Sequence, residues 1–456
     1  MAKVKTKWIC QQCGYESAGY LGKCPECGSW SSFVEEVQTN LKPQNISPQG
    51  ISNEAKPSLI KDIHIGEEVR VSTNISEFDR ILGGGLVQGS LILIAGDPGI
   101  GKSTILLQTS GELAKNNQKI LYVSAEESAS QLKLRANRLG VISDNLYVYP
   151  QTNLENIRQQ IDEIQPDTVV IDSIQAIYSQ TVASSAGSVS QIRECCNILM
   201  QIAKTQNITV IVIGHVTKDG NIAGPKILEH MVDAVISFEG DKYKSYRMLR
   251  ALKNRFGNTS EVGIFEMHEK GLVEVKNPNE LFLNERSQDA IPGSAIIVTN
   301  EGTRPLLVEI QALVGTTPYP TPRRVTNGVD TSRLLQILAV LEKRVGLNLS
   351  KQDVYVNVMG GLEIDEPSAD LGIALAIATC ARDVVVDPQT VIIGEIGLSG
   401  EIHPVCNLDK RLNEAVISGF KKAIVPYANR DVENDKIKVV PVKRLIDAIS
   451  ACISPN

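Results

Sequence analysis

The sequence predicts an α/β protein built from three parts, and three observations carry this prediction. Between residues 61 and 280, apolar runs with the length of buried strands alternate with amphipathic helical segments, a pattern typical of a mostly parallel sheet covered by helices. The first 36 residues are rich in cysteine and turn residues. From residue 285 onward the order of elements changes, which indicates a separate α/β or α+β domain.

The bulk composition bounds the class of protein. Of the 456 residues, 42% are hydrophobic, and the net charge is −6, so the chain can hold two or three domains with real cores. This charge neither favours nor excludes a nucleic-acid partner, because binding depends on local basic patches. No apolar run approaches the roughly 18 residues of a membrane span, and the N-terminus lacks the apolar stretch of a signal peptide. We expect a cytoplasmic protein with no membrane partner.

Residues 1–36 contain four of the nine cysteines. They form two pairs with the spacing of zinc knuckles: Cys10, Cys13, Cys24 and Cys27. Two such pairs bring four thiolates within tetrahedral reach of one Zn²⁺, and Gly14 and Gly28 permit the tight turns beneath the sulfurs. A site closed by four sulfurs is structural rather than catalytic. Disulfides and a redox pair are the alternatives, and the partner of the module stays open.

A polar linker at residues 37–60 separates this module from the second part. It contains three prolines and lacks a hydrophobic period, which is typical of a mobile connection. The second part, residues 61–280, contains an amphipathic helix from Asn153 to Gln165 with Asn153 as its cap. The strand candidates are residues 91–96, 119–124, 168–173, 209–214 and 232–238.

Residues 96–103 form a complete G-x-x-x-x-G-K-[ST] phosphate-binding loop between a buried strand and a helix. The glycines let backbone N–H groups point at a β-phosphate, Lys102 reaches the β- and γ-phosphates, and the Ser103 hydroxyl holds Mg²⁺. The positive end of the helix faces the same phosphates. The loop therefore predicts binding of a nucleoside triphosphate, which we take to be ATP.

Carboxylates on two neighbouring strands complete the predicted hydrolytic site. Strand 168–173 carries Asp172 at its end, where it would bind Mg²⁺ directly or through water. Glu126 and Glu127 follow strand 119–124 at the edge where parallel sheets bind ligands, and one of them is the candidate base that activates water. Acids favoured by a helix dipole are the alternative. The predicted nucleotide-binding residues are Gly96, Asp97, Pro98, Gly99, Ile100, Gly101, Lys102, Ser103, Thr104 and Asp172.

The run EFDRILGGGLVQGSLILIAGDPGIGKSTILLQ at 77–108, together with Glu126, Asp172 and residues 213–233, is similar to the RecA-type ATPase core. The segment Lys253–Gly257 resembles the KNRFG signature of the RadA (Sms) family of bacterial DNA-repair proteins. The order of a four-cysteine finger, a RecA-like core, KNRFG and a Lon-protease-like domain matches that family over essentially the whole chain.

The resemblance implies an α/β fold: a RecA-like P-loop ATPase core with a small N-terminal zinc ribbon-like module and a C-terminal α+β Lon-protease-like domain at 285–456. It implies a DNA-dependent, helicase-type ATPase that migrates or extends branched strands in homologous recombination, using ATP, Mg²⁺ and Zn²⁺. The implied partners are single-stranded and branched DNA, a RecA-type recombinase, and further copies in a hexameric ring. Glu126 aligns with the catalytic glutamate, and Lys253 and Arg255 would serve the γ-phosphate of a neighbouring subunit.

Other roles stay open for several of these residues. Lys253 and Arg255 also suit a solvated strand or a DNA contact, because residues 242–255 contain six basic residues, no acid and two tyrosines. Two further segments, 178–190 and 217–226, are predicted as flexible DNA-contacting loops. His215 suits a nucleotide sensor or a structural histidine. A nucleotide-switched scaffold that assists a recombinase without translocating is the alternative function.

The C-terminal domain resembles the Lon protease domain at residues 366–370 and 394–405, with Ser368 at the nucleophile position. That chemistry needs a neutral lysine beside the serine. The ungapped motif places Asp409 there, and Lys410 lies about 100° further round the helix. We therefore expect no proteolysis and interpret Ser368 as a helix N-cap. Ring assembly or DNA binding is the expected role, the latter through Arg323, Arg324, Arg333, Lys343 and Arg344.

The elements expected in this domain alternate between strands and helices. The strand candidates are residues 294–299, 304–314, 353–358, 390–396 and 422–426. The helix candidates are residues 332–345, 368–381 and 408–419.

Overall fold

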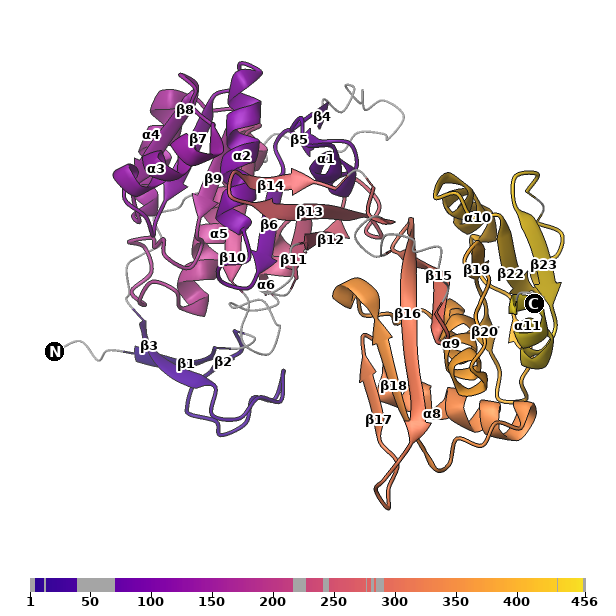
Figure 1. Ribbon diagram of the computed structural model, residues 1–456. Helices are drawn as coiled ribbons and strands as arrows, with labels where there is room; N and C mark the ends of the chain where they lie inside the picture. The colour runs from indigo at the N-terminus through magenta and orange to yellow at the C-terminus, as the bar shows by residue number, and fades with distance from the viewer. Residues whose placement is uncertain are drawn as a thin grey trace, which may run out of the picture. The chain divides into compact units, whose positions relative to one another are not determined.

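The structure, a computed structural model, consists of two compact units, residues 1–275 and 276–456 (Figure 1). It describes residues 5–11, 14–38, 70–215, 227–240, 246–275, 277–279, 283, 291–432 and 434–453. The predicted positions that lie outside these ranges are Cys13, linker residues 39–60, the loop 217–226 and residues 242–245. Among the described helices, none combines the length and the apolar character that a membrane crossing requires.

The N-terminal module is a three-stranded antiparallel sheet with the strand order β2-β1-β3. Its strands are β1 (Lys5–Cys10), β2 (Glu16–Ser17) and β3 (Phe33–Gln38). Cys10, Cys24 and Phe33 form its small buried core, against which Trp8 packs. So small a core makes a structural metal the expected source of stability.

The rest of the first unit is built on a nine-stranded sheet with the order β14-β13-β12-β11-β6-β10-β9-β7-β8. The strands from β11 to β8 in this order run parallel, and β12, β13 and β14 extend the sheet antiparallel. The five strands that the sequence predicts are β6 (Leu91–Gly96), β7 (Ile120–Ser124), β9 (Thr168–Asp172), β10 (Thr209–His215) and β11 (Ala234–Glu239). The others are β8 (Leu146–Pro150), β12 (Tyr246–Asn254), β13 (Val262–His268) and β14 (Gly271–Glu274), with a separate pair β4 (Arg70–Val71) and β5 (Leu86–Val87).

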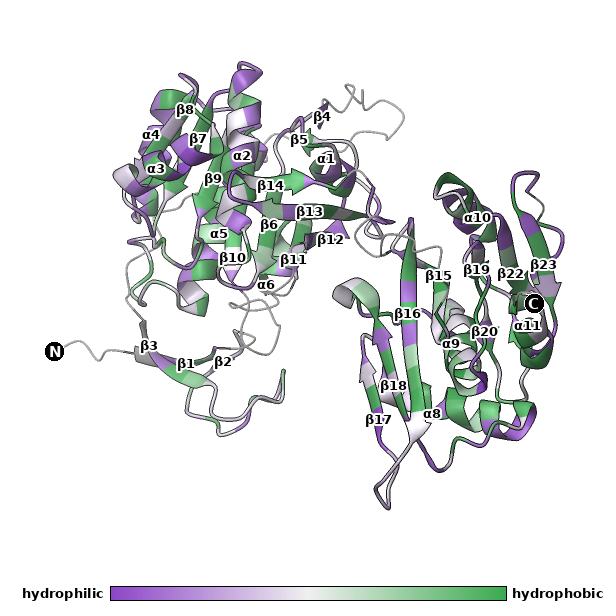
Figure 2. Ribbon diagram, viewed as in Figure 1, coloured by the Kyte–Doolittle hydropathy of each residue, from purple (hydrophilic) through white to green (hydrophobic). Residues whose placement is uncertain are grey.

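Helices cover both faces of this sheet, because alternate residues of each central strand point to opposite sides. Ile92 and Ile94 of β6 pack in one core with α1, α2 and α3, whereas Leu91 and Leu93 pack in a second core with α4, α5 and α6. Figure 2 shows the hydrophobic colouring of these central strands. The Asn153 side chain caps α4 as predicted. The helices are α1 (Ser76–Leu82), α2 (Lys102–Lys115), α3 (Ala129–Leu139), α4 (Leu154–Ile164), α5 (Val189–Gln206) and α6 (Ile227–Met231).

The second unit contains a seven-stranded mixed sheet with the order β17-β18-β16-β15-β19-β22-β23. Its strands are β15 (Ser294–Glu301), β16 (Arg304–Thr316), β17 (Arg324–Asn327), β18 (Gln352–Val358), β19 (Thr390–Ile392), β22 (Lys422–Pro426) and β23 (Lys438–Val442). A second small sheet joins β20 (Glu395–Ile396) and β21 (Ile402–His403). The helices are α8 (Thr331–Val340), α9 (Asp370–Arg382), α10 (Leu408–Ile417) and α11 (Leu445–Cys452).

Two predicted elements of this unit differ in detail from the structure. The helix expected at 332–345 is α-helical only to Val340 and continues as a π-helical turn to Val345. The strand expected at 390–396 divides into β19 and β20, because the N–H of Gly394 donates to the Ser368 carbonyl instead of continuing the sheet. A Cβ on Gly394 would also lie 2.9 Å from a methyl carbon of Ile402, so this turn requires a glycine.

Candidate nucleotide-hydrolysis site

The carboxyl ends of the parallel strands bring the predicted hydrolytic residues to one edge of the sheet, here called the P-loop edge. His215, the last residue of β10, pairs with Gly96 at the end of β6. Ser124 of β7 pairs with Asp172 of β9. The phosphate-binding loop, Asp172 and the residues after Ser124 therefore lie at the same level, as the sequence predicts for a parallel sheet.

Lys102 closes the phosphate-binding loop on itself. Its side chain is only 4% exposed, and its Nζ donates to the carbonyls of Gly96 at 2.7 Å and Asp97 at 2.9 Å. Burial lowers the pKa of Lys102, and the nearby charges of Asp172, Asp97 and Glu126 oppose that shift. The ammonium therefore lies among the carboxylates that the sequence assigned to catalysis. Ligand phosphates offer it the same type of oxygen partner as the two carbonyls.

Asp172 is held by a tyrosine that the sequence reasoning missed. The Tyr122 hydroxyl donates to Asp172 Oδ2 at 2.8 Å, and both side chains are buried. Burial, then the charge of Asp172 and this hydrogen bond, raise the pKa of Tyr122 well above its ordinary value. The hydroxyl thus stays a proton donor and fixes the orientation of the carboxylate. In the sequence, Tyr122 is visible as a single tyrosine in the apolar strand 119–124. That strand neighbours the strand that ends in Asp172.

The structure separates the two adjacent glutamates. Glu126 Oε1 accepts a hydrogen bond from Ser173 Oγ at 2.5 Å and lies 3.4 Å from His215 Nε2. Glu127 instead forms an ion pair with Arg135 of α3. Burial acts to raise the pKa of Glu126, but the hydrogen bonds from Ser173 and His215 and the nearby positive charges hold it below its ordinary value. Glu126 is thus the ionised carboxylate that lies next to the phosphate-binding loop.

His215 combines features of both interpretations made from the sequence. Its Nε2 contacts Glu126, which suits a group that senses the state of the hydrolytic site. Its Nδ1 is buried and has no hydrogen-bond partner among the described residues. A purely structural histidine normally has both ring nitrogens satisfied. The geometry therefore favours a role that is linked to Glu126.

Arg247 contacts the phosphate-binding loop from strand β12, which lies two strands from β6 in the sheet. Its side chain is buried, and its Nε donates to the carbonyl of Ile100 at 3.3 Å. Tyr246 is buried beside it. The interpretation of residues 242–255 as an exposed basic-aromatic DNA surface is therefore wrong for these two residues, because they belong to an interior strand of the sheet.

Lys253 and Arg255 lie at the opposite edge of the sheet, here called the KNRFG edge. The N–H of Arg255 donates to the Asp233 carbonyl, and the N–H of Asp233 donates to the carbonyl of Leu91. Arg255 is thus level with the first residue of β6, whereas the phosphate-binding loop follows its last residue, Gly96. Five residues of a strand span about 17 Å, so these cations do not reach the phosphate-binding loop of their own chain.

Contacts within the chain occupy both cations of the KNRFG edge. Lys253 Nζ donates to the carbonyl of Glu229 in helix α6 at 2.6 Å and to that of Val232, just after the helix, at 2.8 Å. Arg255 Nη1 lies 3.1 Å from Asp233 Oδ1, and its side chain is 56% exposed. Arg255 is thus exposed to solvent as well as paired, and Lys253 is half-buried.

The loop predicted at 178–190 is described throughout and is tied to its own following helix. The buried Gln191 side chain accepts the Ser179 N–H at 2.9 Å and donates to the carbonyls of Ser179, Val182 and Ser184. The Gln191 amide thus holds the loop by hydrogen bonds. The small polar residues of the loop had suggested a segment without such contacts.

The cysteine module has the geometry of a zinc site. The sulfur atoms of Cys10, Cys24 and Cys27 all lie within 4.8 Å of one another, and Cys10 and Cys27 are 3.7 Å apart. Tetrahedral ligands at the usual Zn–S distance of about 2.3 Å are separated by roughly this amount. Gly14 and Gly28 have φ angles of +74° and +73°, as the predicted turns require. No disulfide joins the described cysteines, and the residues fit Zn²⁺.

In the described part of the second unit, Ser368 contacts an arginine where a serine–lysine protease needs a lysine. Ser368 Oγ accepts from Nη1 of the fully buried Arg411 at 3.1 Å, and the same guanidinium pairs with Glu366. Arginine stays protonated and cannot take a proton. Asp409 and Lys410, the residues considered from the sequence, are exposed. The Ser368 side chain does not cap a helix either, since α9 follows Ala369 without a side-chain cap; the N-cap prediction is wrong because Arg411 engages the hydroxyl.

The basic surface predicted on the second unit is smaller than the sequence suggests. Arg333 forms an ion pair with Asp370, and Arg324 donates to the carbonyl of Leu349 at 2.9 Å. The exposed members of the set are Arg323, Lys343 and Arg344.

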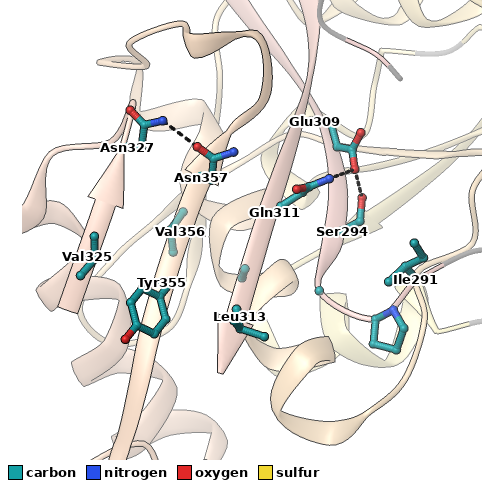
Figure 3. A pocket seen from close by; sticks show the side chains of 13 residues that line it. Ile291, Ser294, Glu309, Gln311, Leu313, Val325, Asn327, Tyr355, Val356 and Asn357 are labelled. Atoms are coloured by element: carbon teal, nitrogen blue, oxygen red, sulfur yellow. Dashed lines mark hydrogen bonds between the residues drawn. The ribbon is translucent and has the colours of Figure 1, made fainter. Parts of the chain in front are cut away.

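A groove of about 510 Å³ lies on the same unit, on strands β15 to β18 (Figure 3). Glu309 is the one charged residue in its lining and accepts hydrogen bonds from Ser294 and Gln311. Apolar side chains such as Leu313 and Val325 line the rest. A groove with an acid and no base does not suit a nucleic-acid backbone.

The fold and site define this chain as a RecA-like P-loop ATPase joined to a zinc ribbon and a Lon-protease-like unit. Family models match it as an AAA domain at residues 57–221, a rubredoxin metal binding domain at 8–35 and subunit ChlI of Mg-chelatase at 328–429. DNA repair protein RadA of Halalkalibacterium halodurans is 51% identical over 99% of this chain and 100% of its own length. The chain belongs to the RadA family of DNA repair proteins.

Two further matches extend this comparison. DNA repair protein RadA of Bacillus subtilis is 50% identical over 98% of this chain and 99% of its own length. A solved KaiC-like protein from Pyrococcus horikoshii OT3 is 22% identical, with a TM-score of 0.39, over 45% of this chain and 99% of its own.

Proposed function

We propose that this chain is a DNA-stimulated ATPase that works as a motor on branched DNA during recombinational repair. The observation that carries the proposal is that the charged residues proposed for hydrolysis lie at two different edges of one sheet. Lys102 and Glu126 lie at the P-loop edge, while Lys253 and Arg255 lie beyond their reach at the KNRFG edge. Such an arrangement becomes complete only when the KNRFG edge of one copy meets the P-loop edge of the next.

The residues have distinct roles in the proposed hydrolysis. Lys102 and the backbone N–H groups of residues 96–104, apart from Pro98, which has none, hold the phosphates. Ser103 and Asp172 hold Mg²⁺, which neutralises charge on the phosphate oxygens. Glu126 orients and deprotonates the attacking water, and its lowered pKa keeps it ionised for that task. Lys253 and Arg255 of a neighbouring copy stabilise the charge that develops on the transferred phosphoryl group.

The family supports a DNA substrate, since the relative from Halalkalibacterium halodurans is named a DNA repair protein. The proposed substrates are single-stranded and branched DNA, with a RecA-type recombinase as protein partner and a hexameric ring as the assembly. The loops at 178–190 and 217–226 are the proposed DNA contacts, and Zn²⁺ in the N-terminal module has a structural role. The proposed location is the cytoplasm. Proteolysis is not proposed, because the cation that contacts Ser368 is an arginine that stays protonated, where the protease chemistry needs a neutral lysine.

A strand-separation experiment tests the motor. Forked DNA is mixed with the protein and either ATP or a non-hydrolysable analogue, and the release of one strand is measured. We expect release with ATP alone, none with the analogue, and none with the Lys102→Ala variant. Binding of the fork that depends on nucleotide, without release in ATP, would contradict the motor and favour the scaffold alternative. ATP hydrolysis that single-stranded DNA does not accelerate would also contradict the motor.

A further inference from the structure

Two residues of the KNRFG segment, Asn254 and Gly257, contact the end of helix α1. The Asn254 side chain donates to the carbonyl of Ile81 at 3.1 Å and accepts the N–H of Phe256 at 2.9 Å. A Cβ on Gly257 would lie 2.9 Å from the Cα of Gly83, so only a glycine fits there without a shift. The segment is therefore a fixed corner of the fold.

The side chain of Arg255 is held by a buried carboxylate next to this corner. Asp233 is 2% exposed and lies between α6 and β11. Its Oδ2 accepts from the N–H of Leu91 at 3.0 Å and from Lys204 Nζ at 2.7 Å, and its Oδ1 lies 3.1 Å from Arg255 Nη1. A buried carboxylate is costly unless it is paired and hydrogen-bonded. Here three donors balance it, and two of them are cations.

Lys204 joins the carboxylate to the KNRFG segment a second time. Its ammonium lies 6.0 Å from the centre of the Phe256 ring, within the range of a cation–π contact, as well as 2.7 Å from Asp233. Lys204 comes from α5, so the arrangement connects α5, the start of β11 and the end of β12. Lys253, in contrast, donates to the backbone carbonyls of Glu229, His230 and Val232.

We propose that Asp233, assisted by Lys204, is a positioning residue for Arg255. The Asp233 carboxylate holds the Arg255 guanidinium in one orientation. This otherwise flexible side chain is then already ordered when the nucleotide site of a neighbouring copy approaches. Such ordering removes part of the entropic cost of the reaction. The proposal rests on the proposed function, in which Arg255 serves the γ-phosphate of another copy.

The Asp233→Asn variant tests this role with little disturbance of the fold. Asparagine keeps the size of the side chain and an oxygen for the Leu91 N–H. Arg255 and Lys204 are 56% and 45% exposed, so both cations can turn to water when the charge is lost. We expect ATP hydrolysis to fall about ten- to a hundredfold, the loss typical of a misplaced catalytic group, with unchanged nucleotide affinity. Lys204→Met should cause a smaller loss in the same direction.

Mixed assemblies distinguish positioning from a general structural role. Asp233→Asn subunits are mixed with Lys102→Ala subunits, which cannot use their own loop but have an intact KNRFG edge. We expect recovered hydrolysis, because the intact loop of an Asp233→Asn subunit then meets a correctly held Arg255. Mixing with Arg255→Ala subunits should give no recovery, since both partners carry the same defect. Asp162→Asn is the matched control: this carboxylate accepts a hydrogen bond from Gln206 of α5 and has no contact with Arg255, so hydrolysis should stay unchanged.

The remaining outcomes of the mixing experiment contradict either the positioning role of Asp233 or the role of Arg255 in a neighbouring subunit. If Arg255→Ala is rescued by Lys102→Ala but Asp233→Asn is not, Asp233 acts within its own subunit and this proposal is wrong, while the proposed function stands. If neither is rescued, the trans role of Arg255 is wrong and the positioning proposal fails with it. Hydrolysis by Asp233→Asn at the wild-type rate would also overturn the proposal.

Discussion

The two edges of the nine-stranded sheet place charges in opposite ways. At the P-loop edge the cation is enclosed: Lys102 is 4% exposed and has carboxylates around it. At the KNRFG edge the carboxylate is enclosed: Asp233 is 2% exposed, and its cations Lys204 and Arg255 are about half exposed. The first arrangement suits a small ligand that enters a closed site. The second presents positive charge outward and suits a partner surface, so assembly should control the activity of the first.

The largest expected effect is the loss of the buried cation at the P-loop edge. Lys102→Ala removes the group that faces the phosphates, and ATP hydrolysis should fall about a thousandfold, as when a preorganised charge-stabilising donor is removed. Nucleotide affinity, measured by titration calorimetry, should fall as well. Retention of either property would show that the loop does not hold the phosphates through this lysine.

The next effect separates the two adjacent acids at the same edge. Glu126→Gln should lower the rate of ATP hydrolysis about a hundredfold or more while nucleotide binding is kept, because it removes only the proposed base. Glu127→Gln is the matched control, and it should change the rate less than threefold, since Glu127 pairs with Arg135 outside the site. Equal losses in the two variants would contradict the assignment of the base to Glu126.

A comparison of two glycines tests whether the KNRFG edge is more tightly packed than the P-loop edge. Gly257→Ala places a methyl group 2.9 Å from the Cα of Gly83, and should destabilise the first unit by about 1–3 kcal/mol. Gly99→Ala meets no atom within 4 Å, and its φ of +79° alone should cost about 1 kcal/mol. Urea unfolding of both variants gives the free energies. A larger loss at Gly99 would reverse the comparison.

The smallest effect concerns pH. The lowered pKa of Glu126 means that the base stays ionised below the ordinary range of a carboxyl group, so hydrolysis should persist as the pH falls toward that range. Ser173→Ala removes one of the hydrogen bonds that favour the ionised form. The pKa of Glu126 should then rise, and the acidic limb of the kcat profile should move to higher pH by about one unit or less. A limb that moves to lower pH would contradict this cause.

The parallel core and the residues of the P-loop edge could be predicted because they depend on local patterns. Apolar runs place the strands, and the carboxyl ends of parallel strands must share one edge. The antiparallel strands β12 to β14 were missed because their sequence is charged and interrupted, although Arg247 and Tyr246 become buried in β12. The choice between Glu126 and Glu127 from the residues alone stayed open, because it depends on which side chain meets Ser173 and His215.

In the second unit, two expectations from the sequence are wrong because they also depend on which side chains meet in the folded structure. The motif placed Asp409 beside Ser368, but the turn of α10 brings Arg411, two residues further on, into the core. The Ser368 hydroxyl therefore contacts a guanidinium instead of capping a helix. A shift of one residue on a helix is a rotation of about 100°, and no one-dimensional pattern resolves it.

By itself, the sequence determined the phosphate-binding loop, the spacing of the cysteine pairs, the order of the parallel strands along the chain and the likeness to the RadA family. These are properties of residue types at short, fixed separations, and the backbone geometry of turns, strands and helices fixes their consequences. Only the tertiary structure decided which side chains enclose Lys102 and Asp172, and that Arg255 and Asp233 meet at the far edge. Those contacts join residues far apart in sequence, and packing alone selects them.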